Sequence, residues 1–189
     1  MVDLYWVPLG AGTPVVQWCG RLFELVMAWW QHRPRNRLFH AALVVEIDGV
    51  RVTVEQAPVP DDHGELRGVV ATGPVGLRWL GRWRVFRYEV RRWPGGSIPD
   101  LDAAVGPPRR ITDDPAVARR VLEAVAAVPT PVWGRDEQHA GEMWNSNSVV
   151  AWTLDRAGVD VDAIACVAGG RAPGWHAGLV GARRPPMRF

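Results

Sequence analysis

Residues Asn145 to Ser148 form a short polar segment that runs directly into an apolar helical pattern. The apolar positions of that pattern, which ends before Gly158, are Val149, Val150, Trp152, Leu154 and Ala157. A helix that begins here leaves the backbone N–H groups of its first turn unpaired, and its dipole is positive at that end. Ser146 would therefore lie where developing negative charge is stabilised, as the attacking residue of a nucleophilic reaction requires.

A histidine and a carboxylate occur upstream, on two strand-like segments. His40 lies within one apolar run, and Glu55 ends the next. The intervening Asp48-Gly49 is a strong hairpin signal because glycine tolerates positive φ, so the two strands are expected to be antiparallel neighbours. Together with Ser146, these residues could supply a nucleophile, a general base and a group that orients and stabilises the imidazole.

The remaining pattern predicts a mixed α+β domain. The other expected elements are a strand at 3–9, a helix at about 16–31, a loop-rich stretch at 58–76, a strand at 83–93 and a helix opened by Thr112-Asp113-Asp114-Pro115. From about residue 168 the chain is rich in Gly, Pro and Arg and is expected to form a surface extension. No internal repeat or domain boundary is visible, so we predict one domain over 1–189, an antiparallel sheet packed against helices.

The order of these motifs resembles the circularly permuted papain-like group of the NlpC/P60 superfamily. That group has a histidine strand, then a strand ending in a polar residue, and later a nucleophilic cysteine at the start of a helix. The matching segments here are His40-Ala41-Ala42-Leu43-Val44, Val54-Glu55-Gln56-Ala57 and Asn145-Ser146-Asn147-Ser148-Val149. The resemblance covers about 38–57 and 140–158, and Ser146 stands where the family has cysteine. Uncharacterised bacterial proteins with Asn-Ser-Asn-(Ser/Thr) at this position are also similar, which favours a natural serine over an engineered one.

The resemblance implies a papain-like fold and a hydrolase or acyltransferase acting on an amide or ester bond, without a cofactor. Ser146 would attack a small-molecule, peptide or acyl substrate, His40 would take its proton, and Glu55 would orient the imidazole. The residues expected to contact the substrate are Trp144, Asn145 and Asn147. A cysteine here would react as a thiolate, whereas a serine depends on a general base, which typically contributes about 10²–10⁴-fold.

Two other functions fit the same sequence. The chain could be a catalytically inactive binding module that retains a papain-like cleft after losing the thiol. It could also be a structural partner in a larger assembly, with tryptophans on its surface; the chain has eleven. The sequence does not predict an oligomeric state.

The individual residues also have structural interpretations. Asn145 or Ser146 could be only an N-cap, and Ser148 suits the first helical turn. His40 could be a hydrogen-bonded core histidine, and Glu55 a charge at a hairpin edge. For Asn145, turn formation is the simpler interpretation, as it is for the second asparagine of the segment.

Composition is that of an ordinary globular protein: 48% of the residues are apolar, 22% are charged and the net charge is +2. This charge is too small to indicate nucleic-acid binding. All 22 basic residues are arginine, which suggests a bacterial genome rich in G and C. Cys19 and Cys166 lack CxxC spacing and the histidines lack ligand spacing, so neither a disulfide nor a metal site is expected. No segment approaches the roughly 20 apolar residues of a membrane span, and no signal peptide is visible, so we expect a cytoplasmic protein.

Arginine and aromatic residues alternate between Arg78 and Trp93. Such a pattern could meet anionic lipid, carboxylates or nucleic acid. A half-buried strand whose arginines face water is the simpler interpretation.

Overall fold

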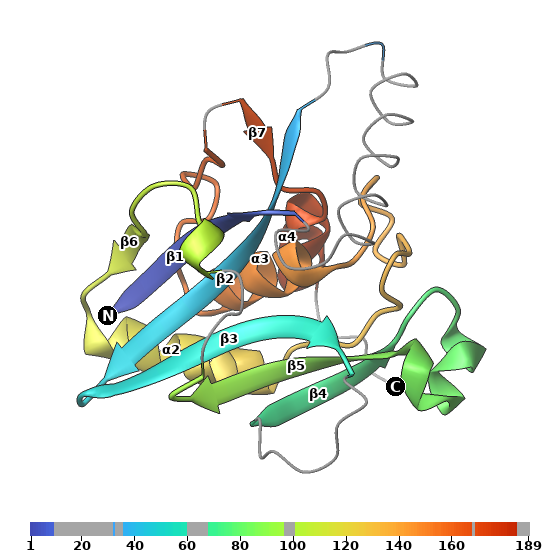
Figure 1. The fold of residues 1–189 in the computed structure, drawn as a ribbon, viewed down its shortest axis with the longest axis horizontal. Coiled ribbons are helices and arrows are strands. Elements are labelled where there is room, and N and C mark those ends of the chain that lie inside the picture. The colour runs from blue at the N-terminus through green and yellow to red at the C-terminus, as the bar shows by residue number, and fades with distance from the viewer. Residues whose placement is uncertain (10–31, 33–35, 60–67, 97–100, 168, 185–189) are drawn as a thin grey trace.

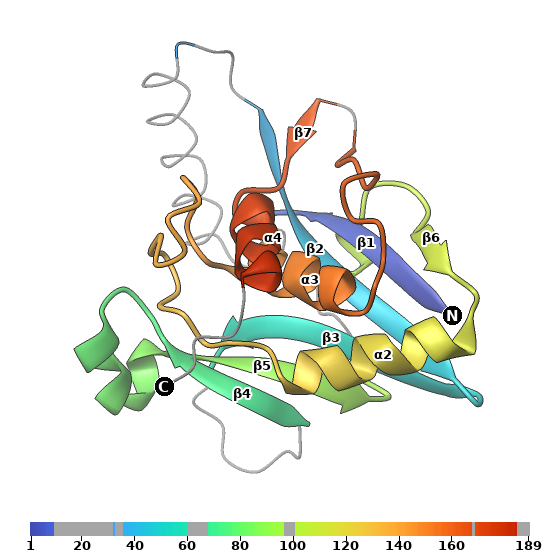
Figure 2. The ribbon, with the colours of Figure 1, turned by 180° about the vertical axis from the view of Figure 1, so that it is seen from behind.

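In the described part of the chain, six antiparallel strands lie side by side in one sheet, and three α-helices cover one of its faces (Figures 1 and 2). This is a computed structural model that describes residues 1–9, 32, 36–59, 68–96, 101–167 and 169–184. The strands are β1 (Val2–Pro8), β2 (Arg37–Ile47), β3 (Val50–Pro58), β4 (Val69–Pro74), β5 (Arg87–Pro94) and β6 (Arg109–Thr112). Their spatial order is β4-β5-β3-β2-β1-β6, and a short β7 (Gly170–Arg171) pairs in parallel with the start of β2. The result is a single α+β domain with an antiparallel sheet, as the sequence predicts.

Helices α2 (Pro115–Ala126), α3 (Ser146–Arg156) and α4 (Trp175–Arg183) lie on the same side of the sheet (Figure 2). Single 3₁₀ turns, η1 (Arg78–Arg82), η2 (Arg84–Phe86) and η3 (Leu101–Ala103), occur between strands. The predicted N-terminal cap of α2 is confirmed, because the Asp114 carboxylate accepts a hydrogen bond from the N–H of Ala116 at 2.7 Å. None of the helices formed by the described residues is long and apolar enough to cross a membrane.

Alternation along β2 decides which side chains face the helices. The side chains that join the large core beneath α2 and α3 are Phe39, Ala41, Leu43 and Val45. Ala42 and Val44 point to the other face, where a small cluster includes Tyr5 and Leu101. His40 has the same parity as Ala42 and therefore lies on the face away from the helices.

The β2–β3 hairpin confirms the sequence prediction in detail. Asp48 and Gly49 have φ values of 53° and 76°, the left-handed geometry of a two-residue hairpin turn. The register pairs Leu43 with Val54 and Ile47 with Val50, so His40 and Glu55 do lie on antiparallel neighbours.

Several expected elements differ from the structure. Strand β4 occupies part of the stretch expected to be a loop, and β6 was not expected. The predicted strand at 83–93 begins only at Arg87, because the preceding residues form η1 and η2. Within the predicted surface extension, 175–183 instead form α4, whose Ala177, Gly178 and Leu179 are buried. The expected helix at about 16–31 and Cys19 lie outside the described residues.

Helix α4 approaches α3 so closely that Gly178 has no room for a side chain. A Cβ built on Gly178 would lie 2.3 Å from the carbonyl oxygen of Ser148, in the first turn of α3. We expect Gly178→Ala to lower the free energy of unfolding by about 1–3 kcal/mol, because α4 must move away from α3. Gly181→Ala is the matched control, since its Cβ would meet Trp144 at an ordinary 3.4 Å.

Urea unfolding of both variants measures this difference. The control should be neutral or more stable, because alanine favours a helix over glycine by about 1 kcal/mol. Equal effects of the two substitutions would show that the helices do not pack at the described distance.

Candidate functional site

The segment 145–148, called here the Asn-Ser segment, begins α3. The side-chain oxygen of Asn145 accepts a hydrogen bond from the N–H of Asn147 at 2.9 Å, which makes Asn145 the N-cap. The Ser148 hydroxyl accepts one from the N–H of Asn145 at 3.0 Å and completes a capping box. The predicted start of this helix is therefore confirmed.

Asn147 connects the first turn of α3 to the strand that carries His40. Its side-chain oxygen accepts a hydrogen bond from the N–H of Ala41 at 2.7 Å, and its side-chain nitrogen donates to the carbonyl of Phe39 at 3.0 Å. The same nitrogen donates to the carbonyl of Pro173 at 2.8 Å. Asn147 thus bonds the β2 backbone on both sides of His40. This part of β2 precedes Leu43, where the pairing with β3 begins.

The turn before α4 completes this junction. Ser148 is fully buried and donates to the carbonyl of Gly174 at 2.7 Å, so its hydroxyl serves the structure. Glu142 accepts hydrogen bonds from the N–H groups of Gly174 and His176 and pairs with Arg171 at 2.9 Å. A carboxylate suits this place because the start of a helix is electropositive. Neither Glu142 nor the Pro173-Gly174 turn was among the predicted site residues.

Ser146 is the exception within the Asn-Ser segment. It is half-buried, and among the described residues neither its hydroxyl nor its backbone N–H has a hydrogen-bond partner. Both groups belong to the first residue of α3, where an N–H cannot find a partner inside the helix. A hydroxyl that could attack and an N–H that could stabilise an oxyanion are therefore both unengaged at one residue.

His40 and Glu55 both point to the face of the sheet opposite the helices. Val54 belongs to the core beneath α3, so its neighbour Glu55 points the other way, as His40 does. The β2–β3 register ends at Leu43 and Val54, so His40 and Glu55 share this face of the sheet, but no described strand pairing places them opposite or diagonal to each other. No hydrogen bond joins Ser146 to His40 among the residues described, and α3 packs on the other face.

Glu55 belongs to a buried charge cluster. Arg91, directly opposite on β5, lies 3.2 Å from the carboxylate of Glu55 and 3.1 Å from that of Glu89. The Arg91 side chain is only 7% exposed, so its charge needs these carboxylates. A carboxylate offers about four acceptor positions, so the ion pair leaves Glu55 capacity to bond another group.

Two other buried side chains concern the predicted site. Trp144 is fully buried, and its side chain packs in the core. Gln56 faces the helix layer beside Val54, and both polar atoms of its amide lack a hydrogen-bond partner among the described residues. The alternation of Val52, Val54 and Gln56 predicts this orientation, so the sequence held a signal for Gln56 as a buried polar group.

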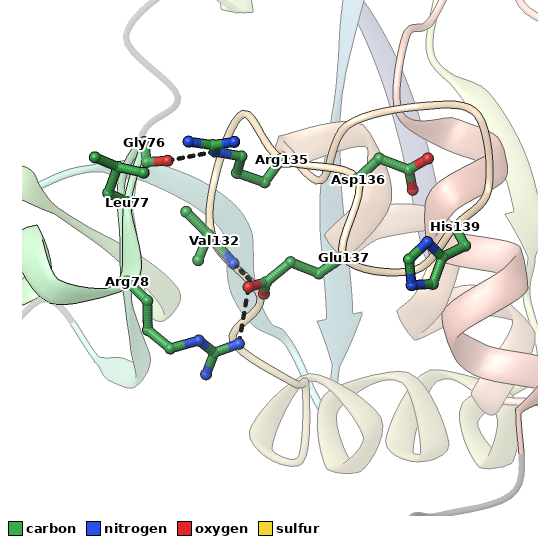
Figure 3. Close-up of a pocket in the computed structure, with 8 residues that line it drawn as sticks. All are labelled: Gly76, Leu77, Arg78, Val132, Arg135, Asp136, Glu137 and His139. Carbon is green, nitrogen blue, oxygen red and sulfur yellow. Dashed lines mark hydrogen bonds and ion pairs between the residues drawn. The ribbon is translucent and has the colours of Figure 1, made fainter.

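An open cleft of about 640 Å³ lies beside the loop that leads to α3 (Figure 3). Most charged side chains that line the cleft already have partners. Glu137 accepts a hydrogen bond from the N–H of Val132 at 2.9 Å and pairs with Arg78 at 2.8 Å, and Arg135 donates to the carbonyl of Gly76. His139 lines this cleft but is exposed, with a φ of 49°. Ser146, His40 and Glu55 are not lining residues.

Burial favours the neutral form of two titratable side chains, Tyr88 and Cys166. Burial raises the pKa of Tyr88, whose hydroxyl donates to the carbonyl of Pro131 at 2.8 Å. Burial likewise raises the pKa of the Cys166 thiol, which is not in a disulfide. Cys166 therefore lacks the lowered pKa of a reactive cysteine. In the described part of the chain, no three His, Cys, Asp or Glu side chains gather where they could hold a metal ion.

The structure thus places the predicted site residues in two groups. His40 and Glu55 share one face of the sheet, and the Asn-Ser segment is bonded to the His40 strand through Asn147. No protein-family model, curated protein or solved structure matches the chain.

Proposed function

We propose that the protein is a hydrolase or acyltransferase that acts on an amide or ester bond through Ser146. One observation carries this proposal. Within the part of the chain that the structure describes, Ser146 is the residue of the Asn-Ser segment whose hydroxyl and N–H make no structural bond, while its three neighbours build the junction. A serine that serves only in capping has its hydroxyl engaged by backbone groups, as Ser148 does with the N–H of Asn145 and the carbonyl of Gly174.

In the proposed reaction, Ser146 is the nucleophile and His40 the general base. The Ser146 oxygen attacks the carbonyl carbon of the substrate, His40 accepts the hydroxyl proton, and the Ser146 N–H bonds the resulting oxyanion. The protonated His40 then gives its proton to the leaving amine or alcohol as the carbonyl–leaving-group bond breaks. Water or a second acceptor cleaves the acyl-serine ester in the same manner. The proposal requires the His40 side chain to reach Ser146 around the edge of β2 to which Asn147 is bonded, because His40 has the parity of the face away from α3.

A second candidate function, an inactive binding module with a papain-like arrangement, has its own support. His40 lies on the face away from α3, and Glu55 is held by Arg91. Both features suit side chains that stabilise the sheet, with Ser146 remaining as a hydrogen-bonding group at a helix N-terminus. The two functions differ in whether the Ser146 hydroxyl is nucleophilic.

A fluorophosphonate probe followed by intact-mass analysis separates them. We expect one adduct per chain, absent in Ser146→Ala and formed at wild-type rate in Ser97→Ala, a control among the chain's three serines. His40→Ala should slow labelling by about 10²–10⁴-fold, the usual contribution of a general base.

A wild-type chain that does not label would contradict the enzyme proposal. Ser146→Cys then tests the binding module as a decayed enzyme. Rapid iodoacetamide labelling at the new cysteine that depends on His40 would show that the site supports thiolate chemistry. Cys166 gives a slow background because burial raises its pKa.

A further inference from the structure

Most of the large apolar side chains that the described residues expose gather at one place, residues 77–86, called here the aromatic tip. Its exposed apolar residues are Leu77, Trp79, Trp83, Val85 and Phe86. Trp79 is 56% exposed, Trp83 45% and Val85 73%, and neither η1 nor η2 contains a buried residue. Exposed apolar groups that cluster in this way mark an interaction surface, whereas scattered ones need no explanation.

The aromatic tip is held in a defined shape. The Trp79 and Trp83 rings meet edge to face with centroids 5.6 Å apart, and Phe86 meets Trp83 at 6.5 Å. Arg87 donates to the carbonyls of Gly81 and Arg82 and so closes the turn from β5. The tip projects beyond the ends of β4 and β5, away from the helix layer (Figures 1 and 2).

Positive charge is combined with these aromatic groups. Residues 77–86 contain three exposed arginines and no acidic residue. The Arg82 guanidinium lies 4.1 Å from the centre of the Trp83 ring and 5.3 Å from that of Trp79. Arg78 pairs with Glu137 at the base of the tip. Leu77 and Arg78 of the tip also line the cleft shown in Figure 3.

We infer that the aromatic tip docks the protein on a phospholipid surface with anionic headgroups. Tryptophan rings favour the headgroup level of a bilayer because they are apolar with one polar edge. Arginine at the same level pairs with lipid phosphates, and its stem remains on apolar surface. A convex segment this short offers far less than the roughly 20–30 residues per side of a stable protein interface, whereas a membrane needs only a shallow insertion. The inference does not depend on the chemistry proposed for Ser146.

Sedimentation of the full chain with lipid vesicles tests this inference. We expect binding to phosphatidylcholine vesicles that contain phosphatidylglycerol, weaker binding to pure phosphatidylcholine, and release by salt. Trp79→Ala/Trp83→Ala should lower the partition coefficient roughly tenfold or more. Arg82→Gln should lower it about fivefold on the anionic vesicles alone, the usual contribution of one arginine near such a surface.

Val50→Ala/Arg51→Gln is the matched control, because it removes an exposed apolar residue and an exposed arginine at the β2–β3 hairpin. Thermal unfolding verifies that all variants are folded. Failure of the wild type to bind anionic vesicles would overturn the inference, as would equal losses in the control. Dimerisation that the tryptophan substitutions abolish, without vesicle binding, would assign the tip to a second copy of the chain instead.

Discussion

Asn147→Ala is expected to lower the free energy of unfolding by about 2–4 kcal/mol, whereas Ser146→Ala changes it by less than about 0.5 kcal/mol. The two residues are neighbours in one helical turn, but their side chains have opposite roles. Asn147 is 3% exposed and bonds β2 and the turn before α4. The Ser146 hydroxyl has no hydrogen-bond partner among the described residues.

The size of the Asn147 effect follows from the groups it would leave behind. Without the Asn147 amide, the N–H of Ala41 and the carbonyl of Phe39 lose their described hydrogen-bond partner in a buried part of β2. Each unpaired buried group costs about 1–3 kcal/mol. The carbonyl of Pro173 retains a bond from Asn145 at 2.8 Å, so it adds less.

Urea unfolding followed by circular dichroism measures both variants. Asn147→Asp is the informative companion, because it retains an acceptor for Ala41 but loses the donor to Phe39 and Pro173. We expect it to be at least as destabilised as Asn147→Ala. An unaffected Asn147→Ala protein would mean that α3 is not anchored to β2 as described.

The same bonds limit what Asn147 can do for a substrate. An asparagine amide has two donor hydrogens, and both are engaged by backbone carbonyls. The predicted contact between Asn147 and a substrate therefore has no donor left, and Trp144 is buried away from solvent. Asn145 is half-buried and is the remaining predicted residue that could contact a substrate directly.

Local signals predicted the elements around the site because their causes are local. Asp48-Gly49 fixes a hairpin through its own backbone angles, and Asp114 caps the helix that follows it. The anchor of α3 has no such signal. Asn147 and Ala41 are separated by 106 positions, and an asparagine beside a helix start predicts a cap or a turn rather than a bond to a distant strand.

Helix α4 was mistaken for an irregular extension for a related reason. Its two glycines lower helix propensity, and Gly174 ahead of it has a φ of 86°. The space at Gly178 shows that tertiary packing selected the glycine: the backbone of Ser148 occupies the place of a side chain. Composition alone does not distinguish such a helix from a loop.

Arg91→Met is the second substitution with a large expected effect, a loss of about 3–5 kcal/mol in the free energy of unfolding. Arg91 stands between the carboxylates of Glu55 and Glu89, whose side chains are 13% and 16% exposed. Without the guanidinium, two largely desolvated negative charges remain near each other. Glu55→Gln should cost only about 1–2 kcal/mol, because Arg91 retains Glu89 and the carbonyl of Pro58.

The Glu55→Gln protein also decides which role the carboxylate has. If Glu55 only neutralises Arg91, the amide variant is mildly destabilised and its Ser146 reacts with the fluorophosphonate at the wild-type rate. If Glu55 orients and charge-stabilises His40, labelling slows markedly while folding stays near wild type. Glu89→Gln is the matched control, since it removes the other carboxylate that pairs with Arg91 and is not proposed to act on His40. Equal slowing in the two variants would assign the effect to the charge cluster as a whole and contradict a specific role for Glu55.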